Sequence, residues 1–138
     1  MKPLRILVTG SRHWRDGAAI ALGISSWLES IGTSIGGAYP IPVIVHGGQR
    51  TWDPERREWY GADWHAGHAA RTWGFGEERH PADWERHGRA AGPIRNLKMI
   101  RLGADVCLAF PLGKSPGTRH CMREAAKAGI PVVPLGRP

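Results

Sequence analysis

The sequence predicts an α/β fold with a mostly parallel five-stranded sheet between two layers of helices, and three observations lead to this class. Short apolar runs at 5–9, 43–46 and 106–111 each end in a glycine-containing turn. Helical patterns with one apolar face lie between these runs. The length of 138 residues suits a single domain, 1–138, with one core.

The composition excludes a membrane-spanning protein. Apolar residues make up 41% of the chain, but no apolar run approaches the ~18 residues of a membrane span. The N-terminal sequence MKPLRILVTG lacks the features of a secretory signal, so we expect a cytoplasmic location and no membrane partner. Cys107 and Cys121 have no partner at metal-ligand spacing, and we interpret them as core or surface residues rather than a disulfide.

The net charge of +7 favours anionic partners. Cations clustered on one face would indicate nucleic acid, but here they are spread along the chain. The densest run, 50–57, is interleaved with Asp53 and Glu55. We interpret the charge as attraction for small phosphorylated ligands and as general solubility. Nucleic-acid binding is the less favoured alternative.

The run RILVT at 5–9 predicts a central first strand, and Gly10 and Ser11 predict a tight turn after it. Arg12 follows at a position from which it can reach an anion. Asp16 is the expected N-cap of the next helix. The apolar face expected on that helix consists of Ile20, Ile24, Trp27, Leu28 and Ile31.

The second strand, 43–46, also ends in glycine, at Gly47 and Gly48. Ligands of open parallel sheets lie outside the carboxyl ends of the strands, so turns after several strands can build one site together. The G-x-G-x-x-G pattern of ordinary dinucleotide sites does not follow the first strand, and we expect no cofactor.

Residues 49–60, QRTWDPERREWY, are interpreted as an insertion and as a candidate lid over the ligand. Long structureless loops in small domains are usually functional or disordered. Trp52, Trp59 and Tyr60 favour an ordered role. They either stack on a ligand base or pack against protein, and packing is favoured.

A second helix is expected at 63–73, with Asp63 as a possible N-cap. His65 and His68 on this helix have a spacing that suits a metal. No third ligand lies near them in the sequence, so a solvated helix face is favoured and no metal is expected.

A polar, peripheral strand at 75–80 leads to a connector, 81–93, with functional side chains concentrated in seven positions. They are Asp83, Trp84, His87 and Arg89. Pro93 is expected to begin the next helix. Arg95 and Asn96 in its first turn either bind a phosphate or ribose or mark an exposed helix start.

The strand at 106–111 is apolar on both faces, and the loop 113–118 joins it to a helix at 119–127. Glycines in this loop let backbone N–H groups approach an anion, and the helix start adds unpaired donors. The loop is therefore a candidate phosphate site. Taken alone, an ordinary strand-to-helix connection explains it equally well.

Motifs run through the whole chain: VTGSRHW at 8–14, VHGG at 45–48, GAD at 61–63 and 103–105, PADWERHGRAAGPIRN at 81–96, AFPLGKSPGT at 109–118 and AGIPV at 128–132. In this order they resemble the YspA (YpsA-related) group of the SLOG superfamily, and the 81–96 block is the most specific part. The resemblance implies a Rossmann-like three-layer sandwich that binds nucleotides or nucleotide-derived ligands and forms homo-oligomers. The superfamily includes lonely-guy phosphoribohydrolases and the DNA-processing protein, and many YspA-like members occur in phages.

The resemblance implies that Gly10, Ser11 and Arg12 form a first ligand loop, and it matches Arg95 and Asn96 to a helix-start pair. It also implies a GGxGT-type phosphate loop, matched here by Gly113, Gly117 and Thr118. The other residues assigned to the ligand site are Trp14, Gly47, Gly48, Asp63, Pro111, Lys114 and Ser115. Two departures matter. Lys114, Ser115 and Pro116 make the loop longer or stiffer, and His120 and Cys121 stand where the phosphoribohydrolases carry a glutamate.

We expect a sheet order of 3-2-1-4-5, with one phosphorylated ligand between the turns after strands 1 and 4. In this interpretation Arg12 and Arg95 neutralise the phosphate and the backbone of 113–118 cradles it. Asp63 or Asp83 bonds a ribose hydroxyl, and Trp14 stacks on the base.

Binding without turnover is the favoured function. The protein would be a sensor or sequestering protein for a ligand of the ADP-ribose, cyclic nucleotide or mononucleotide type. If it is encoded by a phage, we expect it to act against host defence in the host cytoplasm. The alternative is a nucleoside 5′-monophosphate phosphoribohydrolase that uses Asp63, Asp83 or Glu124 as the acid/base group. Glu124 lies about one helical turn beyond the expected glutamate, and without that carboxylate the oxocarbenium-like charge lacks its stabiliser. Single-stranded DNA binding is a third possibility.

Overall fold

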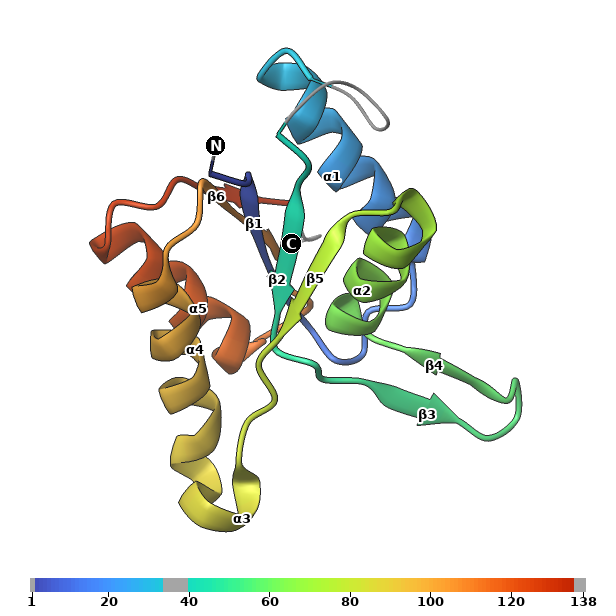
Figure 1. Cartoon of the computed structure of the whole chain (residues 1–138). Coiled ribbons are helices and arrows are strands. Elements are labelled where there is room, and N and C mark those ends of the chain that lie inside the picture. The colour runs from blue at the N-terminus through green and yellow to red at the C-terminus, as the bar shows by residue number, and fades with distance from the viewer. Residues whose placement is uncertain (1, 34–39, 136–138) are drawn as a thin grey trace.

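A parallel five-stranded sheet forms the centre of the protein in a computed structural model that describes residues 2–33 and 40–135 (Figure 1). Across the sheet the strands run in the order β5 (Gly76–Arg79), β2 (Val43–His46), β1 (Arg5–Gly10), β6 (Val106–Phe110) and β7 (Val132–Pro134). Every neighbouring pair is parallel. The predicted α/β class is confirmed.

The strand numbers differ from the predicted 3-2-1-4-5, and the insertion at 49–60 is the reason. This segment was expected to be an insertion and a candidate lid, with no strand assigned to it, but it contributes β3 (Thr51–Asp53) and β4 (Glu58–Tyr60). These two strands form a separate antiparallel hairpin. When the five strands of the main sheet are counted without the hairpin, their order along the sheet matches the predicted one.

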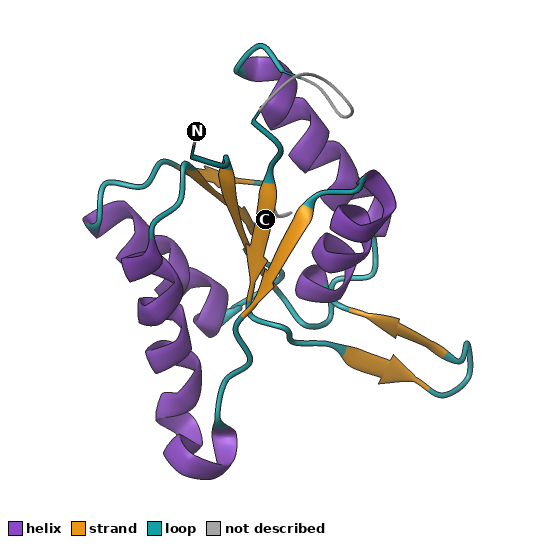
Figure 2. Cartoon of the chain, viewed as in Figure 1, coloured by secondary structure: helices purple, strands orange, loops and turns teal. Residues whose placement is uncertain are grey.

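Helices cover both faces of the sheet (Figure 2). The helices α1 (Gly17–Ser30) and α2 (Ala62–Trp73) pack on one face, where Ile6 and Val8 of β1 are buried. The helices α4 (Ala91–Leu102) and α5 (Pro116–Lys127) pack on the other, where Leu7 is buried. Successive side chains of a strand point to opposite faces, so one short strand contributes to both cores. Burial of each such side chain contributes about 1.5–3 kcal/mol.

The first helix follows the prediction except at its end. Asp16 caps it, because its Oδ1 accepts a hydrogen bond of 3.0 Å from the Ala19 N–H. Its buried face includes Ile20, Ile24 and Leu28, and Trp27 packs against it while partly exposed. Ile31 is 47% exposed, because α1 ends at Ser30 and Ile31 lies outside the helical repeat.

The hairpin β3–β4 projects away from the sheet (Figure 1). Its two strands pair Trp52 with Trp59, whose ring centroids lie 5.0 Å apart. The Arg50 guanidinium lies 3.8 Å from the centroid of Trp59. At the turn, the Asp53 carboxylate accepts hydrogen bonds from the Glu55 and Arg56 N–H groups. Aromatic pairing and a capped turn therefore order a segment whose polar composition indicated a loop.

The helix starts differ from the predicted ones in three places. The N-cap of α2 is Gly61, so Asp63 is not the cap but the second helical residue. The short helices α3 (Trp84–His87) and η1 (Gly88–Ala90) lead directly into α4, which therefore begins before Pro93. Proline is tolerated there because the first turn needs no N–H. Pro116 begins α5.

Three further expectations concern single elements. The predicted peripheral strand is the sheet edge β5. Cys107 and Cys121 are buried and free, as expected for core residues. Within residues 2–33 and 40–135, no helix combines the length and the apolar character that crossing a membrane requires.

Candidate functional site

A cleft of about 560 Å³ lies at the carboxyl ends of β1 and β6. Its walls are the end of β1 with the turn 11–13, the loop 112–118, and the first turns of α4. From β1 the chain continues to β2 and β5 on one side of the sheet, and β6 and β7 fill the other side. The cleft therefore lies where the strand order reverses, which is where open α/β sheets bind ligands. Its volume lies in the ordinary range for ligand pockets.

The turn after β1 forms the first wall. The Ser11 N–H donates to the Phe110 carbonyl at 3.1 Å, and the Ala62 N–H donates to the Ser11 carbonyl at 3.0 Å. These two bonds join the ends of β1 and β6 to the start of α2. Arg12 and the unpredicted His13 are exposed and line the cleft. The structure thus brings Gly10, Ser11 and Arg12 to the cleft, as the sequence predicted.

The start of α5 forms the second wall. Ser115 precedes the helix in a left-handed conformation, φ 37°, and its hydroxyl bonds to the Leu112 N–H and carbonyl at 2.9 Å. It therefore supplies no cap to the helix. Pro116 has no N–H, so the first free backbone donors of α5 are those of Gly117 and Thr118. Both residues line the cleft.

Arg95 and Asn96 line the cleft from α4, but their polar groups already have protein partners. The Arg95 guanidinium donates to the carbonyls of Gly47 at 2.7 Å and His80 at 3.3 Å, and to Asn96 Oδ1 at 2.9 Å. Asn96 Nδ2 donates to the Gly117 carbonyl at 3.2 Å. Burial lowers the pKa of Arg95, which the charge of Asp63 partly offsets. Arg95 was expected to bind the phosphate. Instead, its hydrogen bonds mainly connect the loops after β2 and β5 to α4.

Asp63 is buried at the cleft wall and accepts a hydrogen bond of 3.1 Å from the Gln49 N–H. Burial raises the pKa of its carboxyl group, against the opposing effects of His46 and Arg95. His46 is itself buried, with Nε2 2.7 Å from Glu77 Oε2, and its Nδ1 accepts from the Gly48 N–H at 3.0 Å. The loop after β2 is therefore fixed by buried polar groups on both sides.

Trp14 does not stack on a ligand base. It is 5% exposed and packs edge-on against Phe110, with ring centroids 5.4 Å apart. Its indole N–H donates to the Asp16 carbonyl at 2.8 Å. The sequence could not distinguish this buried tryptophan from an exposed one in the same turn.

Four other predicted ligand residues lie outside the cleft walls: Gly48, Pro111, Gly113 and Lys114. Pro111 is buried. The Gly113 and Lys114 carbonyls accept hydrogen bonds of 2.9 Å from the Arg119 guanidinium, on a side of the loop that does not line the cleft. Within the predicted loop 113–118, the residues that line the cleft are therefore Ser115 and the first three residues of α5, Pro116 to Thr118.

Two of the three candidate catalytic carboxylates also lie elsewhere. Asp83 caps α3 through a hydrogen bond of 3.1 Å from the Arg86 N–H, and it does not line the cleft. Glu124 forms an ion pair with Lys127 at 3.3 Å and lies outside the cleft walls. Among the described residues that line the cleft, Asp63 is the one acidic side chain.

The cleft also contains residues that the sequence did not assign to it. They include His13, Gln49, Trp84, Arg89, Met99, Leu112 and His120. The density of functional groups at 83–89 was a usable signal for Trp84 and Arg89. For His120 the signal was its position, since His120 and Cys121 stand where the phosphoribohydrolases carry a glutamate, but this position was not assigned to the ligand site. In the part of the chain that the structure describes, no group of histidine, cysteine and acidic residues could hold a metal.

Comparison with known proteins finds a close relative of the chain. Over 134 residues, 96% of each chain, the sequence is 48% identical to the "Gene 61 protein" of Mycobacterium phage D29. No family model matches the chain, and no solved structure matches it. Identity of this level over nearly the full length shows common descent and a shared fold. The chain belongs to the family of the Gene 61 protein of phage D29.

Proposed function

We propose that the protein binds a phosphorylated small molecule derived from a nucleotide, and that it acts as a sensor or sequestering protein. The observation that carries this proposal is the uncapped start of α5 in the cleft. The Gly117 and Thr118 N–H groups point along the helix axis at its positive end. An anion such as a phosphate satisfies such donors. This is the role that the SLOG resemblance implies for this loop.

The charges of the cleft support the same ligand class. Arg12 and Arg89 line it and are exposed. Within the described part of the chain, neither guanidinium has a carboxylate within 4.0 Å, so both charges are available to a ligand. The one acidic side chain among the described lining residues is Asp63 of α2, and burial raises its pKa, which favours the neutral form. The balance favours an anion over a cation.

Binding without turnover agrees better with these groups than hydrolysis does. Cleavage of an N-glycosidic bond develops positive charge on the sugar, which an ionised carboxylate stabilises. Asp83 and Glu124 are not in the cleft, and burial favours the neutral form of Asp63. A buried acid with a raised pKa is nevertheless suited to donate a proton. Hydrolysis through Asp63 is therefore the second candidate.

The phage relative supports an extension of the proposal. A phage protein that holds a nucleotide-type signal tightly would lower its free concentration in the infected cell. Binding without turnover is sufficient for that effect, provided that the protein is more abundant than the signal. We propose this anti-defence role for the present family.

Incubation with AMP, GMP, ADP-ribose, its cyclic isomers and cyclic dinucleotides, followed by removal of free ligand, heat release and mass spectrometry, tests the proposal. We expect an intact ligand at a stoichiometric ratio. Arg12→Ala should reduce its recovery, and Arg56→Ala, which removes an exposed arginine of the hairpin, should not. Free base and ribose 5-phosphate at a catalytic ratio, lost in Asp63→Asn, would instead establish the hydrolase. Binding of a single-stranded oligonucleotide with a steep salt dependence, and of none of the small molecules, would establish a nucleic-acid protein.

A further inference from the structure

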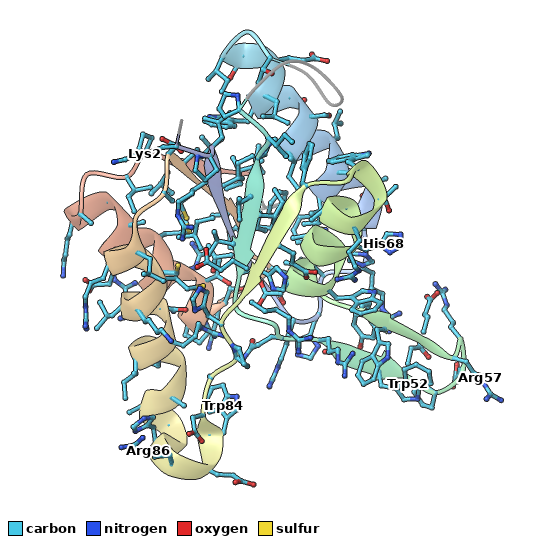
Figure 3. The ribbon with its side chains drawn as sticks, in the orientation of Figure 1. Lys2, Trp52, Arg57, His68, Trp84 and Arg86 are labelled. Atoms are coloured by element: carbon cyan, nitrogen blue, oxygen red, sulfur yellow. The ribbon has the colours of Figure 1, made fainter. Side chains whose placement is uncertain are left out.

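Trp84 and Arg89 extend the cleft beyond the part that suits a phosphate. Both belong to the short α3–η1 segment between β5 and α4. Figure 3 shows Trp84 beside α3, well separated from the hairpin that carries Trp52 and Arg57. Both Trp84 and Arg89 line the same cleft as the start of α5. The cleft thus has a second set of potential ligand groups, and they differ in chemistry from those at α5.

The indole of Trp84 is available for contact. It is 50% exposed, although it lines a cleft. Within residues 2–33 and 40–135, no other aromatic ring pairs with it and no guanidinium stacks on it. Among the described residues that line the cleft, it is the one tryptophan, tyrosine or phenylalanine. The ring therefore offers a large aromatic face on which a planar group of a ligand can stack.

Two local contacts restrain this indole. Asp83 caps the turn that carries it. The ring also lies against the first turn of α4, where a Cβ on Gly92 would be 3.3 Å from Trp84 Cη2. Glycine at 92 therefore makes room for the ring. A side chain that is already held in one place loses little conformational entropy when a ligand stacks on it.

Arg89 provides a donor group that lines the same cleft as the indole. Its side chain is exposed and has no carboxylate partner within the described part of the chain. A guanidinium can donate hydrogen bonds to the acceptor atoms of a base or stack on its plane. An aromatic face and a guanidinium suit a planar, hydrogen-bonding group, whereas the start of α5 suits an anion.

We propose that Trp84 and Arg89 form a subsite for the base of the nucleotide-derived ligand. This inference rests on the proposed function. It narrows the ligand class to molecules that carry both a phosphate and an aromatic base. Sugar phosphates without a base occupy only the end of the cleft near α5. Trp84 thus has the role of stacking on the base, which the sequence analysis had assigned to Trp14.

Calorimetric titration of the full chain with AMP, ADP-ribose and ribose 5-phosphate tests the subsite. Base–aromatic stacking corresponds to a loss of roughly 5- to 150-fold in affinity when the ring is removed. We expect Trp84→Ala to weaken AMP and ADP-ribose by such a factor and to leave ribose 5-phosphate unchanged. Trp84→Phe should restore most of the affinity. Arg12→Ala should weaken all three probes alike, because it acts at the phosphate end.

Trp52→Ala is the matched control, since Trp52 is also a half-exposed tryptophan, 45% exposed, but does not line the cleft. It should change none of the affinities. Equal weakening of ribose 5-phosphate by Trp84→Ala would overturn the base subsite, and so would unchanged binding of all three probes. Wild-type protein that binds ribose 5-phosphate as tightly as AMP would also overturn the subsite while leaving the phosphate site intact. If the wild type bound none of the three, the subsite would be overturned, whereas the proposed function would fall only if the cyclic nucleotides of the wider panel also failed to bind.

Discussion

Substitution of Gly10 by alanine should destabilise the protein by overpacking. A Cβ at position 10 would lie 2.5 Å from the Ala62 Cβ and 2.9 Å from the Phe110 Cβ and carbonyl oxygen. Normal carbon contacts are ~3.5–4.0 Å, so the overlap is about 1 Å. The neighbours are backbone-fixed atoms that cannot rotate away. We expect a loss of about 1–3 kcal/mol in the free energy of unfolding. At this chain length that corresponds to a fall in Tm of roughly 3–10 °C.

Gly117→Ala is the matched comparison, because no atom lies within 4 Å of a Cβ built at that position. Alanine in the first turn of α5 should stabilise the fold by about 0.4–1 kcal/mol, since it reduces the freedom of the unfolded chain. The methyl group should weaken the binding of AMP, because it lies where a phosphate approaches the helix start. Urea denaturation measures both stabilities on one scale. The reasoning is refuted if Gly10→Ala is as stable as the wild type, or if Gly117→Ala is destabilised by as much.

Three other substitutions test the walls of the cleft. Arg95→Lys should lower the free energy of unfolding by about 1–3 kcal/mol in urea denaturation, because it leaves buried acceptors without their donors. Arg101→Lys, on the exposed side of the same helix, should leave the free energy of unfolding unchanged. Equal losses in the two variants would contradict the structural role of Arg95. Burial raises the pKa of Asp63, so the native state holds this proton more tightly than the unfolded state does, and stability should fall as pH rises above the ordinary value of 3.8. Asp63→Asn should remove this fall in denaturation midpoints, and an unchanged pH profile would contradict it. Thr51→Val removes the hydrogen bond of 2.7 Å to the Arg12 carbonyl. We expect it to lower the free energy of unfolding by about 0.5–1.5 kcal/mol and to weaken AMP binding. A calorimetric affinity for AMP equal to that of the wild type would argue against a role of Thr51 in positioning Arg12.

The sheet could be predicted from the sequence because its signals are local. Each buried strand is a continuous apolar run, and each run ends in a glycine turn. The hairpin at 49–60 was missed for the opposite reason. Its order depends on a cross-strand tryptophan pair and a stacked arginine, which polar composition does not reveal.

The candidate site was predictable in place but only partly in detail. Glycines were assigned to the ligand site because they let the backbone approach a ligand closely. At position 10, however, glycine is required because a Cβ would overlap Ala62 and Phe110, whereas a Cβ on Gly117 would meet no protein atom of the described residues within 4 Å. Both types look identical in a sequence. In the same way, Arg12 and Arg95 were assigned one role. Only the fold shows that the Arg95 guanidinium donates to backbone carbonyls, whereas the Arg12 guanidinium has no carboxylate partner among residues 2–33 and 40–135.

The attachment of the hairpin has a consequence for communication across the molecule. Thr51 binds the backbone of Arg12, and Arg15 reaches from the same turn to Asp53 at 2.9 Å. A molecule that bound the hairpin and shifted it would therefore also shift the backbone of Arg12, which faces the cleft. If that molecule changed the affinity of the cleft for its ligand, thermodynamic reciprocity requires that occupation of the cleft change the affinity of the hairpin for that molecule by the same factor. A fluorescent label near Trp52 that responds when AMP binds in the cleft would reveal such coupling, and a label that stays silent would show that the two regions are independent.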